Sequence, residues 1–362
     1  MDCWTYYSKT IDRIVWLKEV ADSAVRRRVE RRLRAHRQLR SIDSVTIAAA
    51  DRLKEEHNTP RTILVRPGTA DDVGRCPGTH GYVCCNYRTF NVYVGCTLGC
   101  TYCIMQSYLR NRTVEVRLPD EGAVEATRVL AAAHPDRTIR VGTGEVGDSL
   151  LFDPLFGLSA DLSAAFADFS NIRFELKSKT DYVDHLPAIT PRGNGIVAFS
   201  LNPPPIVASE EGEAAGLDER LSAADRAWAK GYRLAFHLDP MVHSRSWRDW
   251  YVALVDRLAR FRDAAPEWVS LGTLRYPGTL RPWIERRPYS LDEFVATGDG
   301  KMRYLQTVRA EMYRTVKSRL RRVLPETPVY LCMESPAVWR HVQRRVPDPP
   351  RRLVHIMRPV AE

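Results

Sequence analysis

The sequence of 362 residues has no apolar run long enough to span a membrane and no basic stretch followed by an apolar one at Met1. It also contains no internal repeat and no low-complexity linker. We therefore expect a cytoplasmic protein without a membrane partner. Its length suits one large α/β domain or a core domain with an extension. The oligomeric state does not follow from the sequence.

The eight cysteines are the most informative residues, because clustered cysteines in a reducing compartment more often bind metal than form disulfides. Cys96, Cys100 and Cys103 have the spacing C-x3-C-x2-C. Three thiolates on one loop can hold a 4Fe-4S cluster and leave its fourth iron open to an exchangeable ligand. Zinc sites more often use two separated C-x2-C pairs or histidines. The loop therefore predicts a 4Fe-4S cluster, with three buried or zinc-bound thiols as the alternative.

This cysteine spacing resembles that of radical S-adenosylmethionine enzymes, in which the amino and carboxylate groups of the cofactor bind the open iron. S-adenosyl-L-methionine is therefore the second expected cofactor. Tyr102, between the second and third cysteines, is a candidate catalytic residue that could shield the cluster or stack near adenine. Packing against the barrel is the other interpretation of Tyr102.

The basic residues outnumber the acidic ones, 54 to 44, which gives a formal net charge of +10. Most of the cations are arginines, whose planar fork suits phosphate, so nucleic-acid binding is compatible with the charge. A genome rich in G and C would produce the same composition. Residues 22–40 predict an amphipathic helix with an arginine-rich face, which either contacts a phosphate backbone or is simply solvated.

Strand and helix signals alternate after the cysteine loop, which indicates a parallel sheet. Together with the segment 90–94 before the loop, the expected buried strands are 138–142, 172–177, 195–201, 233–238 and 268–274, and the expected helices are 121–133, 155–168, 218–230 and 246–263. The predicted fold is α/β, a partial (β/α)6 TIM-like barrel with an N-terminal helical extension and a C-terminal cap. The active site would lie at the carboxyl ends of the strands.

The predicted organisation has three parts. Residues 1–89 form the basic extension, with a strand near 63–66 and a cysteine-containing loop. Residues 90–275 form the radical S-adenosylmethionine barrel. Residues 276–362 form the cap and a substrate-binding region, with a helix over 302–322, a strand over 329–333 and a helix from 336.

Polar residues that follow the expected strands are candidates for binding the cofactor. Gly144 permits close approach of the backbone, and Glu145 can hold the amino group of the methionine moiety. Lys179 could pair with its carboxylate. Ser200 and Asn202, just before three prolines that turn the chain outward, could reach ribose or substrate. A surface or capping role is the alternative for each of them.

Several motifs together resemble the spore photoproduct lyase family of radical S-adenosylmethionine DNA repair enzymes, from about Cys96 to the cap. The resemblance is carried by the cysteine loop and by four further segments, Lys179 with 182–186, 199–202, 217–221 with 229–232, and 247–251. It implies a 5'-deoxyadenosyl radical that repairs a thymine photoproduct in DNA, and an electron donor such as flavodoxin or ferredoxin. The resemblance also implies that five residues face the DNA, namely Arg275, Tyr276, Lys301, Arg303 and Tyr304.

The sequence departs from this family in two places. The hydrogen-donating cysteine of the family aligns within 142–145, where this chain has no thiol, and Ile104 stands where the lyase has a tyrosine. We therefore expect a related branch that acts on this or another lesion. The alternatives are a radical enzyme with a non-DNA substrate and a nucleic-acid-binding protein with a structural cluster. Four cysteines could supply a second cluster or a replacement thiol, or be inert, namely Cys76, Cys84, Cys85 and Cys332.

Overall fold

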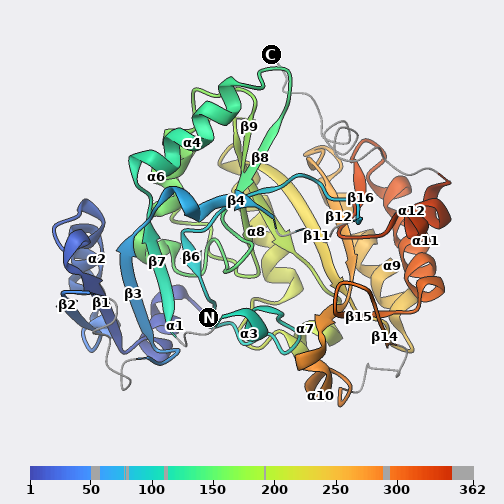
Figure 1. Cartoon of the computed structure of the whole chain (residues 1–362), viewed down its shortest axis with the longest axis horizontal. Helices are drawn as coiled ribbons and strands as arrows, with labels where there is room; N and C mark the ends of the chain where they lie inside the picture. Colours follow the sequence, from blue (N-terminus) through green and yellow to red (C-terminus); the bar gives the residue numbers. More distant parts are fainter. Residues whose placement is uncertain are drawn as a thin grey trace.

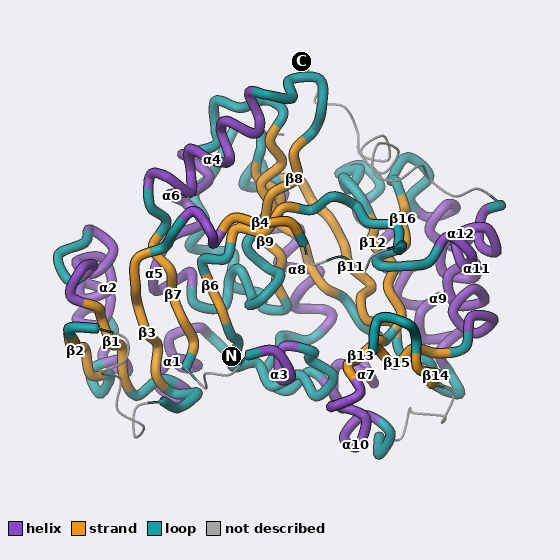
Figure 2. Tube along the Cα trace, in the orientation of Figure 1, coloured by secondary structure: helices purple, strands orange, loops and turns teal. Residues whose placement is uncertain are grey.

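The computed structural model describes residues 1–49, 58–76, 78, 81–109, 113–190, 193–287 and 294–344. A curled eight-stranded sheet forms its centre, in the order β16-β12-β11-β10-β9-β8-β5-β4 (Figures 1 and 2). All neighbours are parallel except β4 and β5. The strands are β4 (Val73–Arg75), β5 (Arg88–Phe90), β8 (Ile139–Gly142), β9 (Ile172–Ser178), β10 (Gly195–Ser200), β11 (Arg233–Met241), β12 (Val269–Thr273) and β16 (Val329–Leu331).

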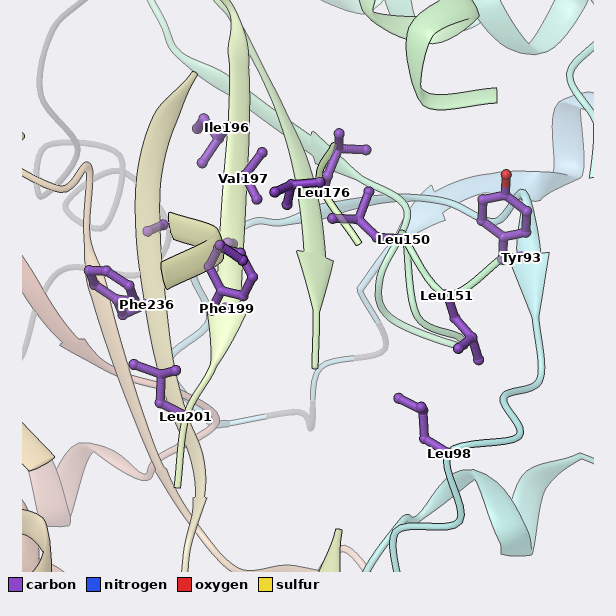
Figure 3. Close-up of a cluster of buried hydrophobic side chains, with 14 of the residues drawn as sticks. Tyr93, Leu98, Leu150, Leu151, Leu176, Ile196, Val197, Phe199, Leu201 and Phe236 are labelled. Atoms are coloured by element: carbon purple, nitrogen blue, oxygen red, sulfur yellow. The ribbon is translucent and has the colours of Figure 1, made fainter. Parts of the chain in front are cut away.

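This sheet is an incomplete barrel, which confirms the predicted fold. The strands are almost continuously buried, as parallel strands covered by helices must be. Strand β10 is a nearly continuous apolar run, whereas β9 alternates apolar residues with Arg173, Glu175 and Lys177. Leu176, Val197, Phe199 and Phe236 come from three neighbouring strands and pack in the core shown in Figure 3. The short β16, expected in the cap, pairs with β12 and extends the barrel sheet.

Helices follow most of the barrel strands. They are α4 (Glu121–Ala132), α5 (Asp153–Phe156), α6 (Leu158–Ala165), α7 (Pro204–Glu210), α8 (Leu217–Ala229) and α9 (Trp247–Arg257). Helix α8 illustrates the local cause: Leu217, Leu221 and Ala224 recur at helical spacing on its buried face. At its first turn the Glu219 carboxylate accepts a hydrogen bond from the Gly216 N–H at 2.6 Å. The predicted helices 121–133 and 218–230 are therefore found almost unchanged.

A second sheet, in the order β2-β1-β3-β7-β6, joins the N-terminal extension to two strands that lie beyond residue 89, β6 and β7. The elements of the extension and of this sheet are α1 (Cys3–Thr10), β1 (Arg13–Leu17), α2 (Ala24–Ala35), β2 (Asp43–Ile47), β3 (Thr62–Pro67), β6 (Tyr93–Val94) and β7 (Val114–Leu118). Helix α2 and strand β3 were predicted, whereas β1, β2 and β7 were not. The segment 90–94, predicted as the first barrel strand, is divided: Phe90 ends β5 of the barrel sheet, and Tyr93–Val94 pairs with β7 in the second sheet. Strand β2 is an edge strand with mostly exposed side chains, so it lacks the apolar signal of a buried strand. Figure 1 shows this sheet and α2 at one end of the molecule.

The C-terminal region packs at the opposite end of the barrel (Figure 1). It contains the short helix α10 and a small antiparallel sheet in the order β13-β15-β14. The elements of this region are β13 (Arg275–Pro277), α10 (Arg281–Ile284), β14 (Phe294–Ala296), β15 (Lys301–Tyr304), α11 (Gln306–Val323) and α12 (Pro336–Gln343). The short helix α3 (Met105–Tyr108) follows the cysteine loop. Within the predicted cap, residues 288–293 and 345–362 lie outside the described residues.

In the described part of the chain, no helix has both the length and the apolar character needed to cross a membrane. All eight cysteines lie in described segments, and each is a free thiol.

Candidate active site

A cavity of about 230 Å³ opens at the carboxyl ends of the barrel strands. The three cysteines of the loop line it on one side. Residues that follow β8, β9, β10 and β11 line the rest, because the carboxyl ends of parallel strands meet at one edge of a sheet. The residues that the sequence singled out in this lining are Tyr102, Gly144, Glu145, Lys179, Ser200 and Arg275. The arrangement brings the predicted cluster loop and most of the predicted cofactor-binding residues to one place.

The cysteine loop is fixed at both of its ends and in its middle. Gly95 (φ +89°) and Gly99 (φ +72°) adopt left-handed conformations that favour glycine, so the chain can turn sharply on each side of Cys96. Between them the Leu98 side chain is 1% exposed and anchors the loop in the core. The end of α7 and the segment after it also hold this loop, because the Thr101 N–H bonds Glu210 O at 2.9 Å and the Glu213 N–H bonds Leu98 O at 2.8 Å.

The three thiols fit an iron-sulfur cluster better than a single metal ion. Within the described residues, no three His, Cys, Asp or Glu side chains are arranged around one common ion. In a 4Fe-4S cluster each thiolate binds a different iron atom, so the sulfurs need not converge on one point. Burial raises the pKa of the Cys100 thiol to about 12, although the positive charge of Lys179 opposes the rise. Metal binding must therefore displace a proton from Cys100.

A buried carboxylate, Glu211, organises the wall next to the cysteine loop. It accepts hydrogen bonds from Lys179 Nζ at 2.7 Å and from Asn202 Nδ2 at 2.9 Å. Tyr102 and Arg220 also donate to it. Desolvation opposes ionisation of this carboxyl, but Lys179 and Arg220 outweigh it and hold the pKa of Glu211 well below its usual range. The network therefore contains a buried, ionised carboxylate with two cations beside it.

This network explains the positions of three predicted site residues. The Tyr102 hydroxyl accepts a hydrogen bond from Lys179 Nζ at 2.8 Å, so its ring is held beside the cluster loop. Asn202 is fully buried and does not line the cavity. Its amide oxygen accepts from the Tyr251 hydroxyl at 2.8 Å, which makes it a link between α9 and the site. Sequence reasoning missed Glu211, because it follows a short helix and has no motif spacing.

A second carboxylate, Asp148, fixes the segment that carries Gly144 and Glu145. It accepts from the Lys179 N–H at 2.7 Å and from the Ser178 hydroxyl at 2.8 Å, at the end of β9. Burial raises its pKa above the usual aspartate value, although these hydrogen bonds oppose the rise. Asp148 therefore ties the end of β9 to the loop after β8.

Gly144 and Glu145 occupy two different environments within that segment. A Cβ on Gly144 would lie 2.7 Å from Lys177 Cβ and 2.8 Å from Lys177 O, so only glycine fits there. The Glu145 carboxylate lines the cavity and lies 3.4 Å from Lys177 Nζ. Glu145 is therefore exposed to a ligand but already has one cationic neighbour.

A buried ionic group supports the cavity from inside the barrel. Arg140 donates to both oxygens of Glu175, with the shortest separation 2.7 Å, and His237 Nε2 lies 2.7 Å from Glu175 Oε1. Burial opposes ionisation of Glu175, but Arg140 and His237 lower its pKa to about 2. Desolvation by burial lowers the pKa of His237, which lines the cavity. The barrel interior thus holds an ionised carboxylate in contact with an imidazole whose pKa is lowered.

The five residues expected to face DNA have different environments. Arg275 lines the cavity and pairs with Asp239 at 3.0 Å, and Lys301 is partly exposed. Tyr276, Arg303 and Tyr304 are at most 1% exposed, because they pack inside the small sheet of β13, β14 and β15.

Arg303 is held by Asp299 at 2.6 Å, and the Tyr304 ring stacks on Phe294 with ring centres 4.4 Å apart. These contacts occupy the side chains that would otherwise reach a ligand. Only Arg275 and Lys301 of the five therefore present polar atoms toward the cavity or the solvent.

Comparison with known proteins gives one consistent result. The family model described as spore photoproduct lyase matches residues 85–272, which is more than half of the chain. A spore photoproduct lyase of Geobacillus sp. is 28% identical over 268 residues, which cover 65% of this chain and 73% of that protein. One of Clostridium acetobutylicum is 22% identical over 175 residues, or 48% of this chain and 51% of that protein.

Solved structures agree with the sequence matches at the level of the fold. A mutant spore photoproduct lyase with dinucleoside spore photoproduct has a TM-score of 0.74 at 17% identity, and the match covers 89% of this chain and 98% of that one. A double mutant of the lyase with bound AdoMet and the same dinucleoside gives the same score and coverage. The incomplete barrel described above is therefore the fold of these structures.

Proposed function

Because the chain belongs to the spore photoproduct lyase family, we propose that it is a radical S-adenosylmethionine lyase that repairs spore photoproduct or a related thymine lesion in DNA. The observation that carries the proposal is the position of Cys96, Cys100 and Cys103 together on one wall of the strand-end cavity. Neither a non-DNA substrate nor a merely structural cluster is favoured by this membership.

The proposed cofactors are a 4Fe-4S cluster on the three cysteines and S-adenosyl-L-methionine. When bound, the reduced cluster supplies the electron that splits S-adenosylmethionine into methionine and a 5'-deoxyadenosyl radical. The thiolates of Cys96, Cys100 and Cys103 would hold the cluster, and the buried Leu98 and the segment 210–213 keep the loop in place. Tyr102 closes the cavity beside the loop, where its ring excludes water.

Three groups of the lining would hold the methionine and ribose parts of the cofactor. Glu145 is proposed to bind the amino group, in exchange for part of its contact with Lys177. Lys179 is proposed to attract the carboxylate, since Glu211 keeps it charged and oriented. Ser200 lies in the lining at the end of β10 and is proposed to reach the ribose. Gly144 allows this wall to pack closely, and Asn202 acts through Glu211.

DNA is the proposed partner, with the lesion turned out of the duplex into the cavity. A base inside the stack cannot be reached, and a damaged step is easier to unstack. Arg275 is proposed to bind the lesion at the mouth, and Lys301 to contact phosphate. We propose that the electron comes from a flavodoxin- or ferredoxin-type protein in the cytoplasm, where free thiols stay reduced.

The test is anaerobic reconstitution with iron and sulfide, followed by addition of dithionite, S-adenosylmethionine and dinucleoside spore photoproduct. The wild-type protein is expected to contain about four irons per chain and to release 5'-deoxyadenosine and repaired thymines. Cys100→Ala should give neither product. Cys3→Ala, which removes a thiol that does not line the cavity, should behave as wild type.

Two results would contradict the proposal. An iron-poor protein that binds zinc after the same treatment would remove the radical chemistry. A protein that makes 5'-deoxyadenosine but neither repairs the dinucleoside nor binds irradiated or intact DNA at low salt would keep the chemistry and exclude the lesion.

A further inference from the structure

A thiol outside the cluster loop lies at the rim of the cavity. Cys76 follows β4, and its Sγ is 3.7 Å from Oε1 of Glu145, which lines the cavity with the cluster cysteines. The Cys76 N–H bonds Tyr87 O at 2.9 Å, so the backbone at Cys76 is fixed relative to the strand that follows it. Cys76 itself is partly exposed. A ligand that reached past Glu145 would therefore meet this sulfur.

Cys76 does not stand alone. The side chains of Cys76 and Cys84 are in hydrogen-bond contact, and Cys84 is in contact with Cys85. The contact with Cys76 raises the pKa of Cys84 above the ordinary cysteine value, so Cys84 is a neutral thiol at neutral pH. Hydrogen-atom transfer requires a protonated thiol, because the thiolate has no hydrogen to give. Cys84 therefore keeps its hydrogen beside Cys76.

Tyr87 gives a second, independent observation at the same wall. Its side chain is 4% exposed, and its hydroxyl has no hydrogen-bond partner within the described part of the chain. The hydroxyl oxygen lies only 2.1 Å from the place that a Cβ on Gly142 would occupy, under the segment that leads to Glu145. A buried hydroxyl without a partner is costly, and such groups mark sites with another use. An oxidisable phenol thus lies behind the same rim.

We infer that Cys76 returns the hydrogen atom that completes the repair reaction, with Cys84 as its supporting thiol. The inference rests on the proposed function. The Sγ–H bond of Cys76 breaks homolytically, a C–H bond forms on the carbon radical left after the lesion's cross-link breaks, and the unpaired electron stays on sulfur. One electron from the low-potential protein donor and one proton from water then restore the thiol.

Cys332 is the rival thiol. Its sulfur lies 3.7 Å from Nη2 of Arg275, which also lines the cavity. It is in hydrogen-bond contact with Asp239 as well, so it is engaged by both members of the Asp239–Arg275 ion pair. Cys76 has a single carboxylate contact and a neighbouring thiol instead. We therefore assign the transfer to Cys76 and use Cys332→Ser as the matched control.

The first test is a single turnover in deuterated water with dinucleoside spore photoproduct. Wild type should place solvent deuterium in the methyl group of the released thymine. Cys76→Ser should still make 5'-deoxyadenosine but should release at least about tenfold less thymine per S-adenosylmethionine cleaved. Cys332→Ser should stay within about twofold of wild type. Unchanged yield and label in Cys76→Ser, or a loss that follows Cys332→Ser, would overturn the assignment.

A second test needs no lesion and so separates this inference from the proposed function. Without substrate, the 5'-deoxyadenosyl radical takes hydrogen from a nearby weak bond, and thiol hydrogens exchange with deuterated water. Wild-type 5'-deoxyadenosine should carry deuterium, and Cys76→Ser should lose most of it. Equal labelling of both products would refute Cys76 as the donor even if the wild type repairs no photoproduct.

A third test uses the protein without its cluster. Iodoacetamide should alkylate Cys76 severalfold more slowly when dinucleoside spore photoproduct is present, while the rate at Cys3 stays constant. Mass spectrometry of the peptides gives both rates. Protection of Cys332 in place of Cys76 would place the lesion at the other thiol and overturn the assignment.

Discussion

Removing the charge of Glu211 should destabilise the protein strongly and weaken cofactor binding. Glu211 and Arg220 are both fully buried, and Glu211 also holds Lys179 at 2.7 Å. Glu211→Gln keeps the shape but leaves two cations without their carboxylate. Breaking a buried ion pair in this way costs about 3–5 kcal/mol, because an uncompensated charge stays in the core. We expect a loss of that size in the free energy of unfolding.

Equilibrium urea unfolding of the cluster-free protein, followed by circular dichroism, measures the loss. Glu213→Gln is the matched control, since Glu213 is exposed two residues away and should change stability by less than about 0.5 kcal/mol. Arg220→Met in the Glu211→Gln background should recover part of the loss, because it removes one of the stranded charges.

The same variant should bind S-adenosylmethionine more weakly after reconstitution, because Lys179 and Tyr102 lose the acceptor that orients them. A loss of stability below about 1 kcal/mol in Glu211→Gln would refute the reasoning, since water would then be replacing the carboxylate. Full recovery of stability in the double variant without recovery of binding would show that the network's two roles are separate.

Three further outcomes are expected. The pKa of Glu175 is lowered from 4.5 to about 2, so its stabilisation is complete above about pH 4.5 and is lost as the pH falls toward 2. Glu175→Gln should remove about 3 kcal/mol of this acid dependence in unfolding titrations. Gly144→Ala should cost about 1–3 kcal/mol and weaken S-adenosylmethionine binding, whereas Gly278→Ala, with open space around it, should not. Arg275→Met should raise KM for the dinucleoside severalfold and leave cleavage of S-adenosylmethionine without lesion unchanged.

Each of these three predictions can be contradicted by a specific result. An acid unfolding curve that is the same in wild type and Glu175→Gln would mean that another carboxylate dominates. Equal effects of Gly144→Ala and Gly278→Ala would exclude close packing against Lys177 as the cause. A fall in kcat with unchanged KM for Arg275→Met would place Arg275 in the reaction step and not in substrate binding.

The barrel could be predicted from the sequence because its strands are buried on both faces. Segments such as β10 and β12 are short apolar runs between helical patterns, and these alternate along the chain. The strand ends then place Gly144 and Lys179 at one edge without further information. The cysteine loop reaches this edge from β6 of the second sheet. By contrast, β1 pairs with β2 and with β3 across a long sequence distance, and the exposed β2 has no periodic apolar signal.

Three of the five residues expected to face DNA, Tyr276, Arg303 and Tyr304, are buried, and the sequence does not show this burial. In β15 the residues Met302, Arg303 and Tyr304 are all buried, and the Tyr304 hydroxyl accepts a hydrogen bond from the His243 N–H just after β11 at 3.0 Å. A sequence of cations and aromatics is the same whether it lies on a surface or in such a sheet. Arg303 is buried with its charge paired to Asp299, 2.6 Å away across a turn. The charge composition of the sequence does not reveal this ion pair.

The polar network around Glu211 shows why motif spacing pointed to residues of the cavity lining but not to the residues that support them. The cysteines are recognisable because a 4Fe-4S cluster would bind all three from a single loop. Glu211 acts on residues that come from three separate elements, Tyr102 in the loop, Lys179 after β9 and Arg220 in α8. No spacing rule joins such positions, because only the folded barrel brings them together. A charged residue directly after a helix is otherwise read as solvated. Its burial is therefore the property that a structure adds, and it makes the orientation of Lys179 and Tyr102 depend on the folding of the whole barrel.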